Sequence, residues 1–246
     1  DTSISGKFEG IGARLSKRNQ QVKIVEIISG GPVWRDELLE IGDAILKVGQ
    51  EGEEPIDISG MVLDDAVKLI KGPKGTRVYL TVRRVDGTVE VVSVTRDVVQ
   101  LEETYAKSSL IKDATGNYGL INLPKFYINF EDYNERNAAI DVKKELEQLK
   151  RNNVKGIILD LRNNGGGSLK TVVDMTGYFI KEGPVVQVKS TGGRKEVLED
   201  TDPSVVWDGP LVILVNEFSA SASEILAAAL QDYKRAVVIG SKQTFG

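Results

Sequence analysis

The spacing of apolar and polar residues divides this chain into two segments. In residues 5–97, apolar residues recur at every second position in short runs such as Gln21–Ile28 and Arg77–Arg83, which is typical of half-buried strands. Asp86-Gly87 predicts a hairpin turn into another strand. Leu63–Ile70 is the one stretch here with helical spacing. We expect the first segment to form a small β-rich domain.

Residues 98–246 follow a different rhythm, in which helical patterns alternate with apolar runs of the buried-strand type. In chain order, we expect the helix Ala138–Asn152, the strand Gly156–Leu161, the helix Leu169–Ile180, and the strands Val185–Val188 and Pro210–Val215. Such alternation predicts an α/β layered core. The fold class of the whole chain is therefore α+β, a small β-rich domain followed by a layered α/β domain.

Composition narrows the chemistry. Among 246 residues, 41% are hydrophobic and 28% are charged, which are ordinary globular values. The net charge of -4 gives no electrostatic reason to expect nucleic acid as a partner. The chain has neither cysteine nor histidine, which excludes disulfides, thiolate metal sites and cysteine catalysis. We expect no metal and no cofactor. Because the chain starts at Asp1 without methionine, we expect a mature chain or an excised fragment.

The stretch NEFSASASEILAAALQDYKRA, Asn216–Ala236, places three serines at the entrance of an alanine-rich helix. A strand ending at Val215 and a tight turn would place one serine at the helix N-terminus, where unpaired backbone N–H groups can stabilise an oxyanion. The alternative is that Ser221 or Ser223 only caps the helix. Without histidine, a nucleophilic serine would need another base.

A second stretch, Asp160–Ser168 (DLRNNGGGS), also follows a buried strand and precedes a helix. Its three consecutive glycines let the backbone approach another group closely and turn its N–H groups toward it. A phosphate-binding loop fits poorly, because the stretch has neither a Gly-Lys-Ser/Thr ending nor GxGxxG spacing. An oxyanion-hole loop that faces the serine turn is the sharper interpretation, and a flexible turn is the remaining alternative.

Together these stretches resemble the family of carboxy-terminal processing, or tail-specific, proteases. Members of this family are peptidases with a serine–lysine dyad and a PDZ domain. The matching motifs are in the expected order and cover most of the chain: Phe8–Ala13, Ile70–Gly75, Asp160–Gly167, Ser219–Glu224 and Thr244–Gly246. The resemblance implies a ClpP/crotonase-like protease core for residues 98–246. It also implies a periplasmic location, with a signal peptide that is not in this chain.

The resemblance assigns roles to residues of both loops. Ser221, the middle serine, would be the nucleophile, and the backbone N–H groups of Gly167 and Ala222 would form the oxyanion hole. Ser219 would lie on the strand side, and Ser223 would cap the helix. A lysine whose pKa is lowered by burial can act as the base, so no histidine is needed.

The resemblance also concerns an acidic residue late in the chain and the lysine of the dyad. Asp232 matches an acidic position that is linked to activity in bacterial family members; a solvated carboxylate late in a helix is the equal alternative. The dyad lysine should directly follow the Thr-Phe-Gly that ends at Gly246. We therefore expect a C-terminally incomplete core, and a 246-residue chain that is itself inactive. Lys234 and Lys242 are expected to be surface lysines.

Residues 5–97 resemble a PDZ domain of the bacterial, circularly permuted type. Gly10, Ile11 and Gly12 would form the loop whose backbone N–H groups bind a peptide C-terminus. The peptide would add as a strand between Ala13–Leu15 and the helix Leu63–Ile70. A plain tight turn at Gly10–Gly12 is the alternative.

The resemblance implies an endopeptidase that recognises the apolar C-termini of protein substrates through its PDZ domain and cleaves them through an acyl-enzyme. The expected partners are proteins or peptides with free apolar C-termini, and not nucleic acid; adaptor and oligomer partners are left open. One alternative is a PDZ scaffold protein with an inactive protease core. Another is an acyl-transfer enzyme of the crotonase type, which would leave the first segment unexplained.

Overall fold

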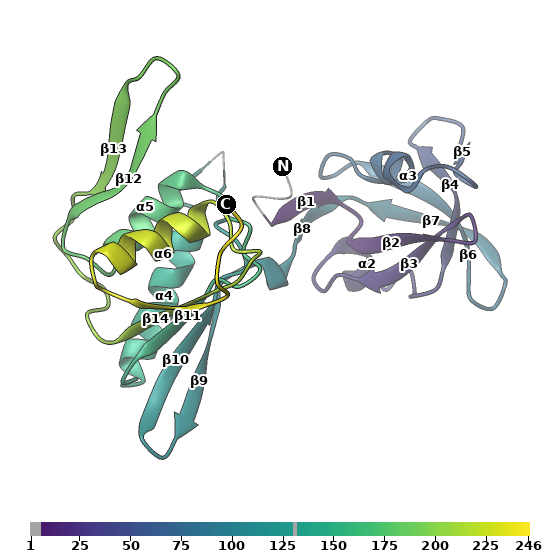
Figure 1. Ribbon diagram of the computed structural model, residues 1–246. Helices are drawn as coiled ribbons and strands as arrows, with labels where there is room; N and C mark the ends of the chain where they lie inside the picture. Colours follow the sequence, from purple (N-terminus) through teal and green to yellow (C-terminus); the bar gives the residue numbers. More distant parts are fainter. Residues whose placement is uncertain (1–5, 130–131) are drawn as a thin grey trace. The chain divides into compact units, whose positions relative to one another are not determined.

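The computed structural model describes residues 6–129 and 132–246 and contains two compact units (Figure 1). One unit spans Lys7–Leu101, and the other consists of Gly6 with Glu102–Gly246. The division falls after Leu101 rather than after residue 97, because β8 (Asp97–Gln100) pairs with β1 (Lys7–Gly10) in an antiparallel ribbon. Within the described ranges, no helix has the length and apolar character needed to span a membrane.

The Lys7–Leu101 unit is built on an antiparallel sheet with the strand order β2-β3-β4-β6-β7, to which β5 adds beside β4. The predicted helix and the predicted strand Arg77–Arg83 are confirmed, and the one-turn helix α2 is too short to have shown a helical period. The elements are β2 (Ala13–Arg18), β3 (Gln21–Ile27), α2 (Pro32–Arg35), β4 (Ala44–Gln50), β5 (Ile56–Asp57), α3 (Leu63–Ile70), β6 (Arg77–Arg83) and β7 (Val89–Thr95).

The core of this unit is formed by the apolar residues that recur at every second position of its strands. Val78, Leu80 and Val82 alternate along β6 and are completely buried, and α3 contributes Ala66 and Ile70 to the same cluster. Full burial of such side chains stabilises a fold by about 1.5–3 kcal/mol each.

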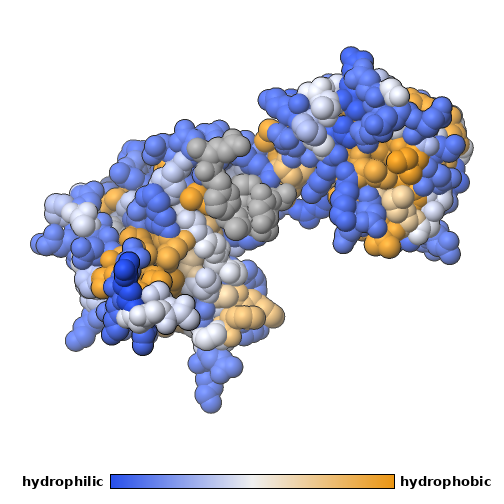
Figure 2. Space-filling model, turned by 90° about the horizontal axis from the view of Figure 1, so that it is seen from above, coloured by the Kyte–Doolittle hydropathy of each residue, from blue (hydrophilic) through white to orange (hydrophobic). Residues whose placement is uncertain are grey.

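On the surface of the unit, a hydrophobic patch is surrounded by hydrophilic residues (Figure 2).

The larger unit contains a five-stranded sheet with the order β15-β14-β11-β10-β9, in which only β9 runs antiparallel to its neighbour. The short 3-10 helix η1 (Glu102–Thr104) precedes it. The remaining elements are β9 (Lys107–Asp113), β10 (Gly116–Asn122), α4 (Ala138–Arg151), β11 (Ile157–Asp160), α5 (Leu169–Gly177), β12 (Gly183–Lys189), β13 (Lys195–Asp200), β14 (Leu211–Val215), α6 (Ala222–Asp232) and β15 (Val237–Gly240).

One predicted strand has a different place from the one that the alternation of helices and strands suggested. Val185–Val188 lies in β12, which forms a two-stranded sheet with β13 and is not part of the five-stranded sheet. The two strands project from the helices as a long hairpin (Figure 1). A short apolar run predicts a strand but not its partner. The strand β13 was not predicted, because its charged residues interrupt the apolar pattern.

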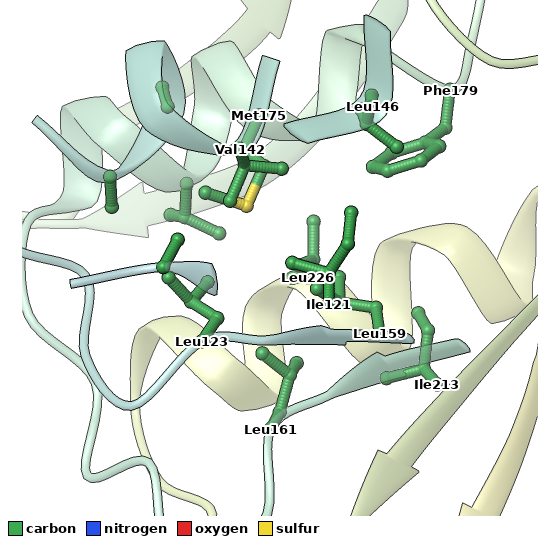
Figure 3. Packing of buried hydrophobic residues seen from close by; sticks show 14 of the residues in the cluster. Ile121, Leu123, Val142, Leu146, Leu159, Leu161, Met175, Phe179, Ile213 and Leu226 are labelled. Carbon is green, nitrogen blue, oxygen red and sulfur yellow. The ribbon is translucent and has the colours of Figure 1, made fainter. Parts of the chain in front are cut away.

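Helices and strands of the larger unit share one core. Val142 and Leu146 of α4 and Met175 of α5 face Ile121 and Leu159 of the strands (Figure 3), and all five side chains are completely buried. The burial of both faces explains why β11 reads as a continuous apolar run. Because β11 and β14 are adjacent and parallel, the loops that follow them leave the same edge of the sheet.

Candidate active site

The two loops that the sequence singled out meet at this edge. The hydroxyl of Ser219 donates to the carbonyl of Leu161 at 2.8 Å, and the hydroxyl of Ser223 donates to the carbonyl of Asn164 at 2.9 Å. Both acceptors belong to the loop after β11, whereas Ser219 lies in the turn between β14 and α6 and Ser223 lies in the first turn of α6. The prediction that the glycine loop faces the serine turn is therefore confirmed.

Of the three serines, only Ser221 is open to solvent. Ser219 and Ser223 are completely buried, whereas Ser221 is exposed. The backbone of Ser221 has φ 53° and ψ -114°, a conformation that L residues rarely adopt. Such backbone strain costs about 1–3 kcal/mol and is concentrated at functional sites. The turn thus presents the Ser221 hydroxyl at the N-terminal end of α6.

The helix cap differs from the expectation. Ser221 occupies the N-cap position of α6, so the prediction that Ser223 caps the helix is wrong. Ser223 lies in the first turn, and its hydroxyl binds the neighbouring loop instead of an N–H group of its own helix. The two flanking serines hold the turn through buried hydrogen bonds, and the middle serine is the exposed N-cap residue of α6.

Glycine is required at two positions beside Ser221. A Cβ on Gly166 would lie 2.8 Å from Ser221 Cβ and 3.1 Å from the backbone nitrogen of Ala222. A Cβ on Gly167 would lie 2.2 Å from the carbonyl oxygen of Phe126. Both glycines have positive φ, 98° and 143°. The lack of a side chain therefore lets Gly166 approach the serine turn and lets Gly167 pack against the backbone of Phe126.

The proposed oxyanion donors have the hydrogen-bonding state that this role requires. Among the hydrogen bonds of the described residues, neither the N–H of Gly167 nor that of Ala222 has an acceptor within the protein. Ala222 begins α6, where N–H groups are unpaired and the helix dipole is positive. This geometry is compatible with an oxyanion hole, and the assignment of Gly167 and Ala222 stays a prediction.

Glu224 is a site residue that the functional assignment from sequence missed. Its Oε2 accepts the backbone N–H of Ser221 at 2.6 Å, and its Oε1 accepts the hydroxyl of Thr244 at 2.6 Å and the N–H of Gly246 at 3.1 Å. The hydrogen bond from Thr244, with the N–H bonds from Gly246 and Ser221, lowers the pKa of Glu224 against the opposing effect of burial. The capping-box pattern Ser221-x-x-Glu224 was the available signal.

The structure does not bring Asp232 to Ser221. Ser221 precedes α6 and Asp232 is its last residue, so eleven residues of helical rise, about 16 Å, separate them. Asp232 is exposed, and its catalytic role stays a prediction without support from this geometry. Lys234 and Lys242 are exposed, as expected. Within the described ranges, the carboxylate hydrogen-bonded to Ser221 is that of Glu224, which accepts the backbone N–H and not the hydroxyl, and no acidic residues group as metal ligands.

The smaller unit contains the predicted peptide-binding elements. In the five-strand order, β2 is an edge strand that pairs only with β3, and α3 lies against it. The carbonyls of Ile11 and Gly12 accept N–H groups of Val33 and Ile28, at 3.0 and 2.9 Å. The N–H groups of Ile11 and Gly12 donate to no acceptor in the described part of the chain. This loop can therefore offer two backbone donors to a carboxylate.

Comparison with known proteins agrees with both units. The model of peptidase family S41 matches residues 117–246, and the PDZ domain model matches residues 2–83. The chain is 40% identical to a tail-specific protease of Haemophilus influenzae over 99% of this chain and 34% of that protein. It is 34% identical to the carboxy-terminal processing protease CtpA of Bacillus subtilis over 100% of this chain and 48% of that protein.

Among solved structures, a putative S41 protease from Bacteroides fragilis shares the fold, with a TM-score of 0.50 and 18% identity over 99% of this chain and 65% of that one. The chain spans half or less of the length of the two curated relatives named above. The S41 match covers more than half of the chain and includes both loops of the site. The chain belongs to peptidase family S41, with a PDZ domain preceding the peptidase region.

Proposed function

We propose that the full-length protein is a serine endopeptidase that selects its substrates by an apolar C-terminal tail. The observation that carries the proposal is the exposed, strained Ser221 at the N-terminus of α6, packed against Gly166. A serine that only stabilised the turn would not need to be exposed in this rare backbone conformation. Ser219 and Ser223 already hold the turn from buried positions.

The reaction would proceed in two steps. Ser221 Oγ forms a bond to the carbonyl carbon of the substrate while its proton passes to a base, and the carbonyl oxygen becomes an oxyanion beside the N–H groups of Gly167 and Ala222. The protonated base then gives the proton to the leaving amine as the peptide C–N bond breaks. Water, activated by the same base, hydrolyses the resulting acyl-enzyme. Preorganised oxyanion donors contribute about 10²–10³ in rate each.

For the base, we propose a lysine in the position directly after Gly246, as the resemblance implies. Glu224 supports this proposal, because its carboxylate binds both Ser221 N–H and the Thr244–Gly246 segment. A residue that follows this segment would start close to the serine turn. We expect residues 1–246 alone to show no cleavage, the chain extended past Gly246 to cleave, and its lysine-to-alanine variant to be inactive. Equal turnover by residues 1–246 would point to Lys242 or Lys234 instead.

The smaller unit would capture the substrate. The N–H groups of Ile11 and Gly12 are open to a terminal carboxylate, and the free edge of β2 beside α3 can accept the tail as an added strand. Because the tail would be bound by one unit and cleavage would occur in the other, the cleavage position would depend on the length and unfolding of the segment upstream of the tail.

The decisive experiment compares the full-length protein with Ser221→Ala on one protein substrate with an apolar tail. Cleavage should disappear while tail binding stays within about twofold. If the parent binds the tail but neither protein cleaves, the alternative of a PDZ scaffold with an inactive core replaces this proposal. Hydrolysis of an acyl-CoA thioester, without peptide cleavage, would revive the acyl-transfer alternative.

A further inference from the structure

Asn164 lies between the serine turn and the glycine loop and is completely buried. We infer that Asn164 is a positioning residue, which sets the Gly166–Gly167 backbone against the Ser221 turn so that the two oxyanion donors converge. The inference rests on the proposed function, because it concerns the geometry of that reaction. Asn164 itself would touch neither the substrate nor the reacting atoms.

The side chain of Asn164 holds the glycine loop. Its Oδ1 accepts the N–H of Gly166 at 2.9 Å, and its Nδ2 donates to the carbonyl of Leu123 at 2.7 Å. Gly166 immediately precedes Gly167. Leu123 directly follows β10, which lies beside β11 on the side opposite to β14. The loop is thus anchored to the sheet one residue before the proposed donor. The loop also binds Phe126, through Phe126 N–H to Gly166 O at 3.0 Å.

The backbone of Asn164 holds the serine turn. Its carbonyl accepts the N–H of Ala220 at 3.0 Å and the hydroxyl of Ser223 at 2.9 Å. Ala220 directly precedes Ser221, and Ser223 directly follows Ala222. The Asn164 carbonyl therefore holds the chain on both sides of the nucleophile and the proposed oxyanion donor. A single residue therefore contacts the flanks of both proposed oxyanion donors.

The chemistry of asparagine explains why this residue type fits. The position needs one acceptor and one donor on a short, neutral side chain. Aspartate would keep the acceptor but leave the Leu123 carbonyl unpaired, and its buried negative charge would oppose the developing oxyanion. Alanine would remove both side-chain bonds and leave the loop held only through its backbone bonds to Phe126 and the serine turn. Because a misplacement of about 1 Å can cost about a hundredfold in rate, loosening the loop should affect the transition state more than substrate binding.

The test uses Asn164→Ala and the nearly isosteric Asn164→Asp in the full-length protein. Each should lower kcat by about a hundredfold while KM stays within about threefold. A peptide aldehyde, which has its aldehyde carbonyl in place of the C-terminal carboxylate, forms a hemiacetal with Ser221 and needs the oxyanion donors, whereas the matched peptide amide forms no such adduct. We expect aldehyde affinity to fall by about a hundredfold in both variants, with amide affinity unchanged.

Asn137 provides a matched control in the same unit. It is completely buried and makes the same two kinds of bond, from Ile140 N–H at 3.0 Å and to the Tyr133 carbonyl at 2.7 Å, but it caps α4. Asn137→Ala should lower the melting temperature and leave kcat and the aldehyde-to-amide affinity ratio unchanged.

The outcomes separate the two proposals. A wild-type aldehyde-to-amide ratio in both Asn164 variants would make Asn164 a merely structural residue and overturn the inference alone. An equally reduced ratio in Asn137→Ala would also overturn it, because general loosening would then explain the effect. If the wild-type protein neither cleaves nor prefers the aldehyde, the proposed function fails and the inference with it. If Asn164→Ala does not fold, the affinity ratio of Asn164→Asp decides between the positioning role and a merely structural one.

Discussion

The hydroxyl of Thr244 donates to Glu224 Oε1 at 2.6 Å, while the other oxygen of the same carboxylate accepts the backbone N–H of Ser221 at 2.6 Å. Thr244 lies 20 residues after Glu224 in sequence, yet one side chain joins the serine turn to the end of the chain. A second link, Phe245 N–H to the Ser219 carbonyl at 3.0 Å, runs in parallel. Glu224 is therefore the residue through which the backbone of Ser221 and the Thr244–Gly246 segment are held together.

Replacing Glu224 should separate these two parts of the site. In the full-length protein, we expect Glu224→Ala to lower kcat by about 10–100-fold with little change in KM, since it removes positioning and not substrate contacts. Glu224→Gln keeps an acceptor and should lose less. Glu217, an exposed carboxylate in the same turn, is the control, and Glu217→Gln should be neutral. Steady-state kinetics that show equal effects at Glu224 and Glu217 would contradict the positioning role.

The two buried serines should matter for stability rather than for chemistry. Ser219→Ala and Ser223→Ala each remove a donor from a buried carbonyl, which costs about 1–3 kcal/mol of unfolding free energy. Both variants should retain turnover at temperatures where they are folded, unlike Ser221→Ala. Denaturant unfolding together with turnover measures both effects. A folded but inactive Ser219→Ala protein would mean that the nucleophile is assigned to the wrong serine.

The peptide-binding prediction can be tested on the terminal carboxylate. A peptide with a free apolar C-terminus should bind the full-length Ser221→Ala protein more tightly than its amidated twin, by about 1–3 kcal/mol, because amidation removes charge-assisted bonds to Ile11 and Gly12 N–H. Isothermal titration calorimetry measures the difference. Equal affinities would rule out the carboxylate-binding loop and leave the alternative of a plain turn.

The sequence predicted those features that depend on local periodicity. Leu63–Ile70 and Arg77–Arg83 were found because one helical or one two-residue period covers each of them. The pairing of Thr244 with Glu224 has no local signal, because it depends on how the chain returns after β15. The partner of β12 was likewise invisible. Ser223 was misread as a cap because its true acceptor, the Asn164 carbonyl, lies 59 residues away in sequence.

Asp97 should give the smaller unit a measurable response to acid. The hydrogen bond from Arg35, then the N–H of Val98, and a smaller contribution from Lys74 lower the pKa of Asp97 to about 2, against the opposing effect of burial. A lowered pKa stabilises the fold above the unfolded value of about 3.9, and that contribution is lost as the pH falls toward 2. Because Arg35 is half exposed, screening should limit the contribution to about 1 kcal/mol.

Asp97→Asn should therefore destabilise the protein near pH 6 and approach wild-type stability near pH 2. Thermal unfolding across this range measures the difference. A stability gap between Asp97→Asn and wild type that does not change with pH would show that the ion pairs with Arg35 and Lys74 contribute nothing through ionisation.

Arg96 anchors the helix that borders the proposed peptide groove. Its guanidinium is buried and donates to the carbonyls of Ile70 and Leu69, at 2.8 and 3.1 Å, and to Thr76 Oγ1 and Gln50 Oε1, at 2.9 and 2.8 Å. In the part of the chain that the structure describes, none of the ion pairs includes Arg96. Burial lowers the pKa of Arg96, but a guanidinium keeps its charge in proteins. The charge is balanced by the free carbonyls and negative dipole at the C-terminal end of α3.

Arg96→Lys keeps the charge but loses the planar fork, so several of these acceptors would be left without a donor. We expect a loss of about 2–4 kcal/mol in unfolding free energy. Peptide affinity should fall as well, although Arg96 would not touch the peptide, because α3 would no longer be fixed beside β2. The neighbouring Arg77 has an exposed side chain, so Arg77→Lys should change stability by less than about 0.5 kcal/mol. Wild-type stability and wild-type peptide affinity in Arg96→Lys would show that the helix is held by its apolar contacts through Ala66 and Ile70 alone.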